Sequence, residues 1–150
     1  MSLKKQFVKK GKYYMNIDDV KEWIQIADDD LYSAQMLNEL VRKPYEIICY
    51  HCAQAIEKYL KGYLTFNDII PQKTHNLLVL LELCIEKDNC FENIKAECGI
   101  MNRYINEIRY PHRIEIKVED VNYSIKVAER IKDIEPMKKL IEIINETNNK

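Results

Sequence analysis

Hydrophobic positions recur every three or four residues over most of the chain, and this spacing is typical of amphipathic helices. The first such stripe begins after Asn16 and consists of Val20, Trp23, Ile24, Ala27, Leu31, Ala34, Leu37 and Val41. Asn16 or Asp18 can cap the first amides of this helix, and Pro44 ends it. The pattern therefore predicts a long first helix from about Asn16 to the residues before Pro44.

A second helix is predicted from about Pro44 to Phe66. Its apolar face is formed by Ile48, Cys49, Cys52, Ala53, Ile56, Leu60 and Tyr63. Beside that face, a polar stripe follows helical spacing and consists of Gln54, Glu57, Lys58 and Lys61. One interpretation of the stripe is an intrahelical Glu57–Lys61 pair, worth ~0.2–0.5 kcal/mol. As a functional feature, it would line a site or an interface.

The second half of the chain predicts further helices. Thr74 can cap the apolar run from Leu77 to Ile85, and this cap favours a helix over a buried strand. A fourth helix is defined by Phe91, Ile94, Cys98, Met101, Ile105 and Ile108, with Gly99 as its weak point and Pro111 as its end. Strict alternation occurs only from Ile114 to Val118 and indicates an extended connector. The last helix runs from Val121 to Ile134, and Pro136 bends or interrupts it before Leu140. We expect an all-α fold, an up-and-down helical bundle of four long helices plus a shorter one.

Composition agrees with this picture. A length of 150 residues corresponds to one domain, and only 3 glycines and 4 prolines imply few, long elements. Hydrophobic residues at 47% and charged residues at 31% are typical of a globular protein. The formal net charge of -1 gives no overall field that attracts nucleic acid or anionic lipid. Any affinity for phosphate must therefore come from a local patch.

We divide the chain into a flexible basic N-terminal arm (1–15), a helical bundle (16–144) and a frayed tail (145–150). The arm carries Lys4, Lys5, Lys9, Lys10 and Lys12 without an acidic residue, and it is either a solvated segment or a phosphate-binding arm. The N-terminus has no apolar segment of the signal-peptide type, and no apolar run is long enough to span a bilayer. The odd count of 5 cysteines indicates free thiols. We expect a cytoplasmic protein.

Two groups of residues resemble metal sites but predict none. Cys49 and Cys52 form a C-x-x-C, but a second pair of ligands is missing, and both thiols lie on the apolar face in mid-helix. Asp28, Asp29 and Asp30 are consecutive in a helix, so their carboxylates splay apart and cannot converge on one ion. The sequence therefore predicts core cysteines, a solvated acidic face, no metal site and no cofactor.

The segment from Arg103 to Arg113 carries the most suggestive chemistry, because arginines and a histidine gather at a helix end and the turn after it. The guanidinium group of arginine can donate two parallel hydrogen bonds to phosphate oxygens, and a histidine can take a proton from a ribose hydroxyl. Phosphate-binding candidates are Arg103, Arg109, Tyr110, Arg113, Lys58 and Lys61, and catalytic candidates are Arg109 and His112. Tyr104 and Tyr110 offer faces on which a base could stack. The same cations also complement a helix dipole, so spacing alone leaves both interpretations open. His75 is either an acid–base group or ligand, or a structural contact at the start of the third helix.

Four ordered motifs resemble those of the HEPN domain (higher eukaryotes and prokaryotes nucleotide-binding). The stretch from Cys52 to Lys61 resembles Q-A-x-E-K-x-L-K, the stretch from Thr74 to Leu77 resembles T-H-D-L, and the stretch from Arg109 to Pro111 resembles R-Y-P. Trp23 and Ala27 to Ala34 suit the opening helix of the family. The resemblance covers about Ile17 to Ile134.

This resemblance implies a helical bundle that forms homodimers and is paired with a minimal nucleotidyltransferase in modules of the toxin–antitoxin kind. Many members are metal-independent ribonucleases with an arginine and a histidine at a set spacing, which Arg103, Arg109 and His112 do not match. We therefore expect a nucleotide-binding or partner-binding module. The alternatives are a metal-independent endoribonuclease toxin that uses Arg109 and His112, and a purely structural dimerisation module.

Overall fold

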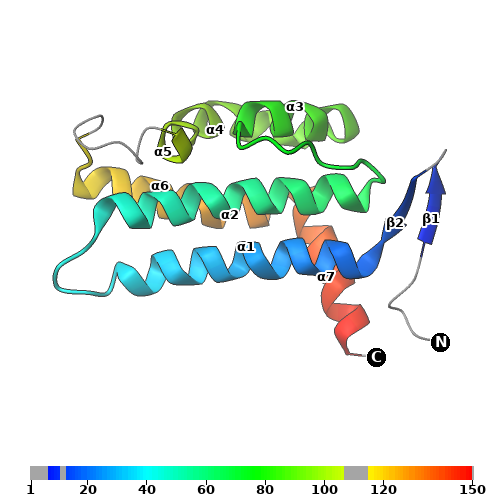
Figure 1. Cartoon of the computed structure of the whole chain (residues 1–150), viewed down its shortest axis with the longest axis horizontal. Helices are drawn as coiled ribbons and strands as arrows, with labels where there is room; N and C mark the ends of the chain where they lie inside the picture. The colour runs from blue at the N-terminus through cyan, green and yellow to red at the C-terminus, as the bar shows by residue number, and fades with distance from the viewer. Residues whose placement is uncertain (1–6, 11–12, 107–114, 150) are drawn as a thin grey trace.

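The computed structural model describes residues 7–10, 13–106 and 115–149, and it shows a bundle of helices with a short N-terminal hairpin (Figure 1). The helices are α1 (Ile17–Leu37), α2 (Tyr45–Phe66), α3 (Leu77–Lys87), the 3-10 helix η2 (Asn89–Ile94), α4 (Lys95–Met101), α5 (Arg103–Asn106), α6 (Val118–Asp133) and α7 (Glu135–Asn148). The predicted all-α helical bundle is confirmed. No helix within the described ranges is long and apolar enough to cross a membrane.

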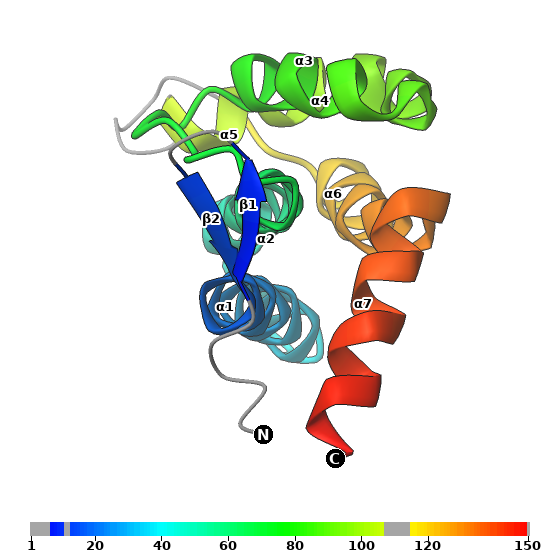
Figure 2. The ribbon, with the colours of Figure 1, turned by 90° about the vertical axis from the view of Figure 1, so that its right-hand side faces the viewer.

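Helix α2 lies at the centre of the bundle. It packs antiparallel against α1, with α6 along another side and the α3–α4–α5 layer above it (Figure 2). Because neighbours surround it, α2 buries its polar stripe as well as its apolar face. Gln54, Glu57 and Lys61 are all buried. The intrahelical Glu57–Lys61 pair is present, with 3.3 Å between Oε2 and Nζ, and it is buried.

One hydrophobic core runs through the bundle. It receives side chains from every long helix, and among the largest fully buried ones are Tyr59, Tyr104, Phe91, Ile48, Ile56, Leu60, Leu80 and Met101. Helix α7 crosses the ends of α1 and α2 obliquely and adds Met137, Leu140 and Ile144 to the same core. The fold is thus held together by burial that links the first helix with the last.

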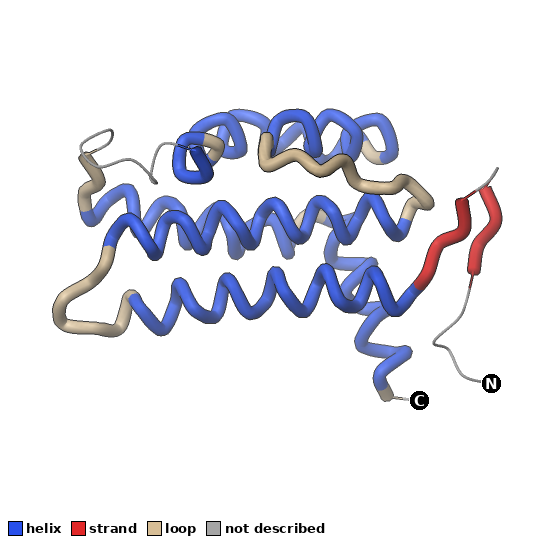
Figure 3. Tube along the Cα trace, viewed as in Figure 1, coloured by secondary structure: helices blue, strands red, loops and turns tan. Residues whose placement is uncertain are grey.

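The connection between α2 and α3 turns back along α2 (Figure 3). Its reversal is a Schellman motif, in which the amides of Asp68 and Ile69 donate to the carbonyls of Thr65 and Leu64. Asp68 occupies the left-handed position with φ 60°, where glycine is more usual. Sequence reasoning missed this turn because aspartate replaces glycine there. The turn directs residues 69–76 back over the polar stripe.

Several predicted boundaries are wrong. Helix α1 ends at Leu37, and Val41 is fully exposed and no longer belongs to the apolar stripe. The cap of α3 is Asn76, whose side chain accepts from the amides of Leu78 and Val79. Thr74 instead accepts from the amide of Asn76, so it stabilises the turn before the cap.

The last two predicted helices are both divided. Residues 89–106 form η2, α4 and α5, where the periodicity predicts one helix. Residues 118–148 form α6 and α7, and Pro136 lies in the first turn of α7, where its missing N–H costs nothing. Helix α7 extends to Asn148, into the segment expected to be frayed. Part of the expected flexible arm forms an antiparallel hairpin of β1 (Phe7–Lys10) and β2 (Tyr13–Asn16).

Candidate functional site

A buried carboxylate with two lysines and a histidine as neighbours forms the centre of the site. Glu57 has a side chain only 1% exposed. Its Oε2 lies 3.1 Å from Nζ of Lys58 and 3.3 Å from Nζ of Lys61. Its Oε1 lies 2.8 Å from Nδ1 of His75. Burying a charge is costly unless it is paired and hydrogen-bonded, and here both carboxylate oxygens have partners.

These contacts determine the ionisation of Glu57. Burial by itself raises the pKa of its carboxyl group. The hydrogen bonds from His75 and Lys58, together with the charges of Lys58 and Lys61, outweigh burial and leave the pKa below its ordinary value. The carboxylate is therefore ionised at neutral pH. Two lysines beside one glutamate leave an excess of positive charge at the cluster.

His75 reaches Glu57 through the reversal of the α2–α3 connection. The turn is held further by Asn102, whose side chain accepts from the amide of Leu77 at 2.9 Å and donates to Oδ1 of Asn76 at 3.1 Å. The motif around His75 thereby contacts α2 on one side and the start of α5 on the other. Sequence spacing offers no sign of Asn102, because its partners lie 25 and 26 residues away.

Lys58 and Gln54 retain unused hydrogen-bond donors. Nζ of Lys58 donates to Oε1 of Gln54 at 2.6 Å and to Glu57, so one of its three N–H groups has no acceptor among the described residues. Nε2 of Gln54 is buried and has no partner within the described part of the chain. A buried donor without a partner is uncommon in native proteins. Both donors belong to side chains one helical turn apart.

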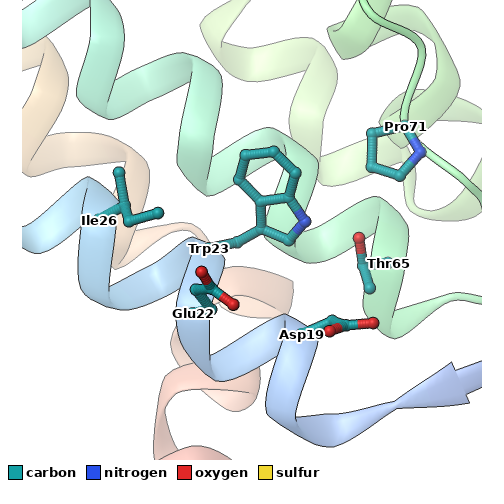
Figure 4. A pocket seen from close by; sticks show the side chains of 6 residues that line it. All are labelled: Asp19, Glu22, Trp23, Ile26, Thr65 and Pro71. Carbon is teal, nitrogen blue, oxygen red and sulfur yellow. The ribbon is translucent and has the colours of Figure 1, made fainter.

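Trp23 connects the cluster to a surface cavity on α1. Nζ of Lys61 lies 5.5 Å from the centre of the indole ring, within the range of a cation–π contact. A cavity of about 310 Å³ beside the indole is lined by Asp19, Glu22, Trp23, Ile26, Thr65 and Pro71 (Figure 4). Its walls combine an aromatic face with two carboxylates. The sequence places Trp23 in an apolar stripe and does not predict this cavity.

The arginine-rich segment is only partly described. Arg103 is exposed at the start of α5, directly after Asn102. Arg109, Tyr110, His112 and Arg113 lie outside the described residues. Tyr104 is 2% exposed, so the prediction that it offers a stacking face is wrong. Among the predicted phosphate contacts, the structure thus places Lys58, Lys61 and Arg103.

The two cysteines of the C-x-x-C belong to the core, as predicted. Cys49 and Cys52 are buried, and burial raises the pKa of the Cys49 thiol to about 11 and that of Cys52 further. Both thiols therefore stay protonated at neutral pH and are poor nucleophiles or ligands.

The aspartates of α1 separate, also as predicted. Asp28 contacts Tyr59 and Lys132, Asp29 accepts from Gln25, and Asp30 bonds to His51. In the part of the chain that the structure describes, no group of histidines, cysteines and carboxylates could hold a metal ion.

Comparison with known proteins identifies the fold family. The chain resembles a crystal structure described as an archaeal HEPN homologue, with 24% identity over 83% of this chain and 97% of that one, and a TM-score of 0.61. It also resembles a crystal structure of a protein from Thermus thermophilus, with 23% identity over 85% of this chain and 97% of that one, and a TM-score of 0.58. The HEPN domain family matches residues 20–140, which include most of α1, all of α2, the His75 turn and α6. The chain therefore belongs to the HEPN domain family.

Proposed function

We propose that this chain is a nucleotide-binding module whose phosphate-contacting surface is built around Lys58. The observation that carries the proposal is the unused N–H of Lys58 beside an exposed imidazole and an excess of positive charge. Phosphate oxygens accept hydrogen bonds from ammonium groups, and such bonds are about twice as strong as neutral ones. Glu57 holds the ammonium of Lys58 in place from the buried side.

Neighbouring features support a nucleotide rather than a bare anion. Trp23 offers an aromatic face at a cavity large enough for a base, and it contacts Lys61 of the cluster. The carboxylates of Asp19 and Glu22 can accept hydrogen bonds from exocyclic amino groups. Arg103 begins the arginine-rich segment next to the bonded pair Asn102–Asn76. We therefore assign Arg103, Arg109, Tyr110 and Arg113 to phosphate and base contacts, together with Lys58. Lys61 is buried beside Glu57 and balances its charge.

Titration with AMP, ATP and GTP tests this proposal. Trp23 is the one tryptophan of the chain, so its fluorescence reports on the cavity, and calorimetry reports on binding as a whole. We expect Lys58→Gln and Arg109→Ala to weaken binding at least tenfold, because a hydrogen bond to a charged group is worth about 1.5–3 kcal/mol. The control is Lys126→Gln, at an exposed position of α6, which should bind as the parent does. Absence of binding at millimolar nucleotide would refute the proposal.

We propose further that the module acts as a homodimer with a minimal nucleotidyltransferase, in a pair of the toxin–antitoxin kind. The support is the likeness of its motifs to those of HEPN proteins that have such partners. Light scattering of the purified chain tests the dimer, and co-purification with a co-expressed minimal nucleotidyltransferase tests the partnership. A stable complex that is indifferent to nucleotide would favour a purely structural dimerisation role.

The second candidate function is metal-independent cleavage of RNA by Arg109 and His112. It is favoured by the bonds of Asn102 to Asn76 and Leu77, which tie the start of the arginine-rich segment to the phosphate-binding face. RNA cleavage in excess EDTA tests it, with Arg109→Ala and His112→Ala as variants. Loss of cleavage in both variants would support this function, and intact RNA throughout would exclude it.

A further inference from the structure

The contact between His75 and Glu57 fixes the tautomer of the imidazole. An ionised carboxylate can only accept hydrogen bonds, so the 2.8 Å contact from Nδ1 to Oε1 requires Nδ1 to carry the proton. In the neutral ring, Nε2 then holds a free lone pair. This is the arrangement in which a histidine serves as a general base.

The two partners differ sharply in exposure. The side chain of Glu57 is 1% exposed, whereas that of His75 is 56% exposed. The carboxylate therefore holds the ring from the buried side, and the outer edge of the ring faces solvent. A buried carboxylate that orients an accessible imidazole is the recurring support for acid–base histidines.

The surroundings of the pair suit a reaction that develops negative charge. Lys58 contacts the same carboxylate as His75, and its remaining N–H is free for a substrate oxygen. A positioned cation beside a reacting phosphoryl group stabilises the transition state. Lys61 also contacts Glu57, but it is nearly buried and serves to balance the charge.

A second histidine–carboxylate pair in the chain lacks these features. His51 lies 2.9 Å from Asp30 on another face of α2. Their side chains are 29% and 19% exposed, and no lysine or arginine contacts either one among the described residues. This pair is a surface link between α1 and α2, and it provides a matched control.

We propose that His75 is a catalytic acid–base residue for cleavage of RNA at the phosphate-binding face, with Glu57 as its positioning residue. The inference rests on the proposed nucleotide-binding face and on the second candidate function, whose substrate is a ribonucleotide strand with a 2′-hydroxyl beside the phosphate. What it adds is the role of His75 and Glu57. Nε2 of His75 takes the proton of the 2′-hydroxyl while the 2′-oxygen bonds to phosphorus. The bond from phosphorus to the 5′-oxygen breaks, and that oxygen takes a proton from water. The products are a 2′,3′-cyclic phosphate and a 5′-hydroxyl end.

The experiment uses the full chain and a short RNA, with an all-DNA strand of the same sequence as substrate control. The variants are His75→Gln, His75→Gly, Glu57→Gln, His112→Ala and the control His51→Gln, all purified in parallel. We expect His75→Gln to lower the cleavage rate at least 100-fold, since general acid–base catalysis contributes about 10²–10⁴-fold. His51→Gln should cleave at the parental rate, and added imidazole should partly restore His75→Gly.

Glu57→Gln distinguishes a positioning role from a merely structural one. Loss of the carboxylate removes the acceptor that fixes the Nδ1–H tautomer and the orientation of the ring, so kcat should fall in folded protein while KM for the RNA stays unchanged. A merely structural role would reduce the amount of folded protein without changing kcat per folded chain.

The outcomes that overturn the inference are distinct. Equal cleavage by the parent and His75→Gln excludes His75, and loss of that cleavage in His112→Ala would assign it to the second candidate function instead. Folded His75→Gly without rescue by imidazole excludes proton transfer by this ring. Nucleotide binding with intact RNA overturns the inference and leaves the proposed binding function standing, whereas absence of both overturns the two together.

Discussion

At the scale of single residues, Glu57 is the side chain whose surroundings matter most. Its charge lies inside the bundle and is balanced by Lys58, Lys61 and His75. When one member of a buried ion pair is removed, the remaining charge stays buried without compensation. The stability of the bundle therefore depends on this carboxylate.

We predict that Glu57→Gln lowers the free energy of unfolding at pH 7 by about 3 kcal/mol, the cost typical of breaking a buried pair. Urea denaturation measures it. The matched control is Glu82→Gln, which breaks the Glu82–Lys95 pair of 2.7 Å between side chains about half exposed. Exposed pairs contribute about 0–1 kcal/mol, so equal effects of the two variants would contradict the prediction.

The lowered pKa of Glu57 implies that the free energy of unfolding depends on pH. The folded-state pKa of Glu57 lies below its ordinary value of 4.5, so the unfolded chain binds this proton more readily. The contribution of Glu57 is then fully present above pH 4.5 and is lost as the pH falls through its folded-state pKa. Urea midpoints measured from about pH 7 to about pH 3 should fall less steeply for Glu57→Gln than for the parent. Parallel curves would show that Glu57 does not carry this dependence.

The thiols provide a second residue-scale prediction. Cys90 is exposed, and the other four cysteines are buried. The hydrogen bond to Asp88 raises the pKa of Cys90, so its labelling should be slow at neutral pH and faster in alkali. We expect a maleimide to label one thiol per native chain and all five after unfolding, as counted by mass spectrometry. Cys90→Ser should abolish the native label, and its persistence would contradict the assignment.

At the scale of elements, the packing of α1 against α2 depends on a close approach at Gly62. A Cβ at this position would lie 2.9 Å from Cδ1 of Ile24 and 3.2 Å from Cβ of Trp23. Gly99 in α4 is the opposite case, because a Cβ there would meet nothing within 4 Å. Gly62 thus allows the close approach of α1 and α2, whereas the space around Gly99 would accept a side chain.

We predict opposite effects of alanine at the two positions. Gly62→Ala should destabilise the protein by about 1–2 kcal/mol, since overpacking outweighs the gain in helix propensity. Gly99→Ala should stabilise it by up to about 1 kcal/mol, because alanine favours the helix and restricts the unfolded chain. Thermal denaturation followed by circular dichroism measures both changes. A shift of the same sign in the two variants would refute this account of α1–α2 packing.

At the scale of the whole molecule, one core joins α1 to α7. Leu140 is fully buried in that core, whereas Ile143 on the same helix is 38% exposed. Trp23 lies far away in sequence, on α1, and reports on the first helix. A domain of this size with a single core is expected to unfold in one cooperative transition.

We predict that urea unfolding followed by Trp23 fluorescence and by far-UV circular dichroism gives the same midpoint. Leu140→Ala should lower both midpoints equally and cost about 2–5 kcal/mol, because it leaves a cavity in the shared core. Ile143→Ala should cost far less. Separate transitions for the two probes would show that α7 unfolds independently of α1.

The sequence by itself determined the helical class, the bounds of α2 within one residue and the location of Cys49 and Cys52 in the core. These features depend on periodicity, since residues spaced three or four apart share one face of a helix. Periodicity failed where the chain changes direction. It missed the Schellman turn with Asp68, the cap at Asn76 and the division of residues 89–106.

Only the tertiary structure decided what the polar stripe of α2 does. The stripe has the same spacing as a solvated surface, but its burial depends on α1 and the returning α2–α3 connection. Likewise, Glu57 and His75 are 18 residues apart and meet because a turn reverses the chain. Helical spacing describes neighbours on one element, whereas contacts between elements depend on loop geometry and packing, which one-dimensional periodicity does not contain.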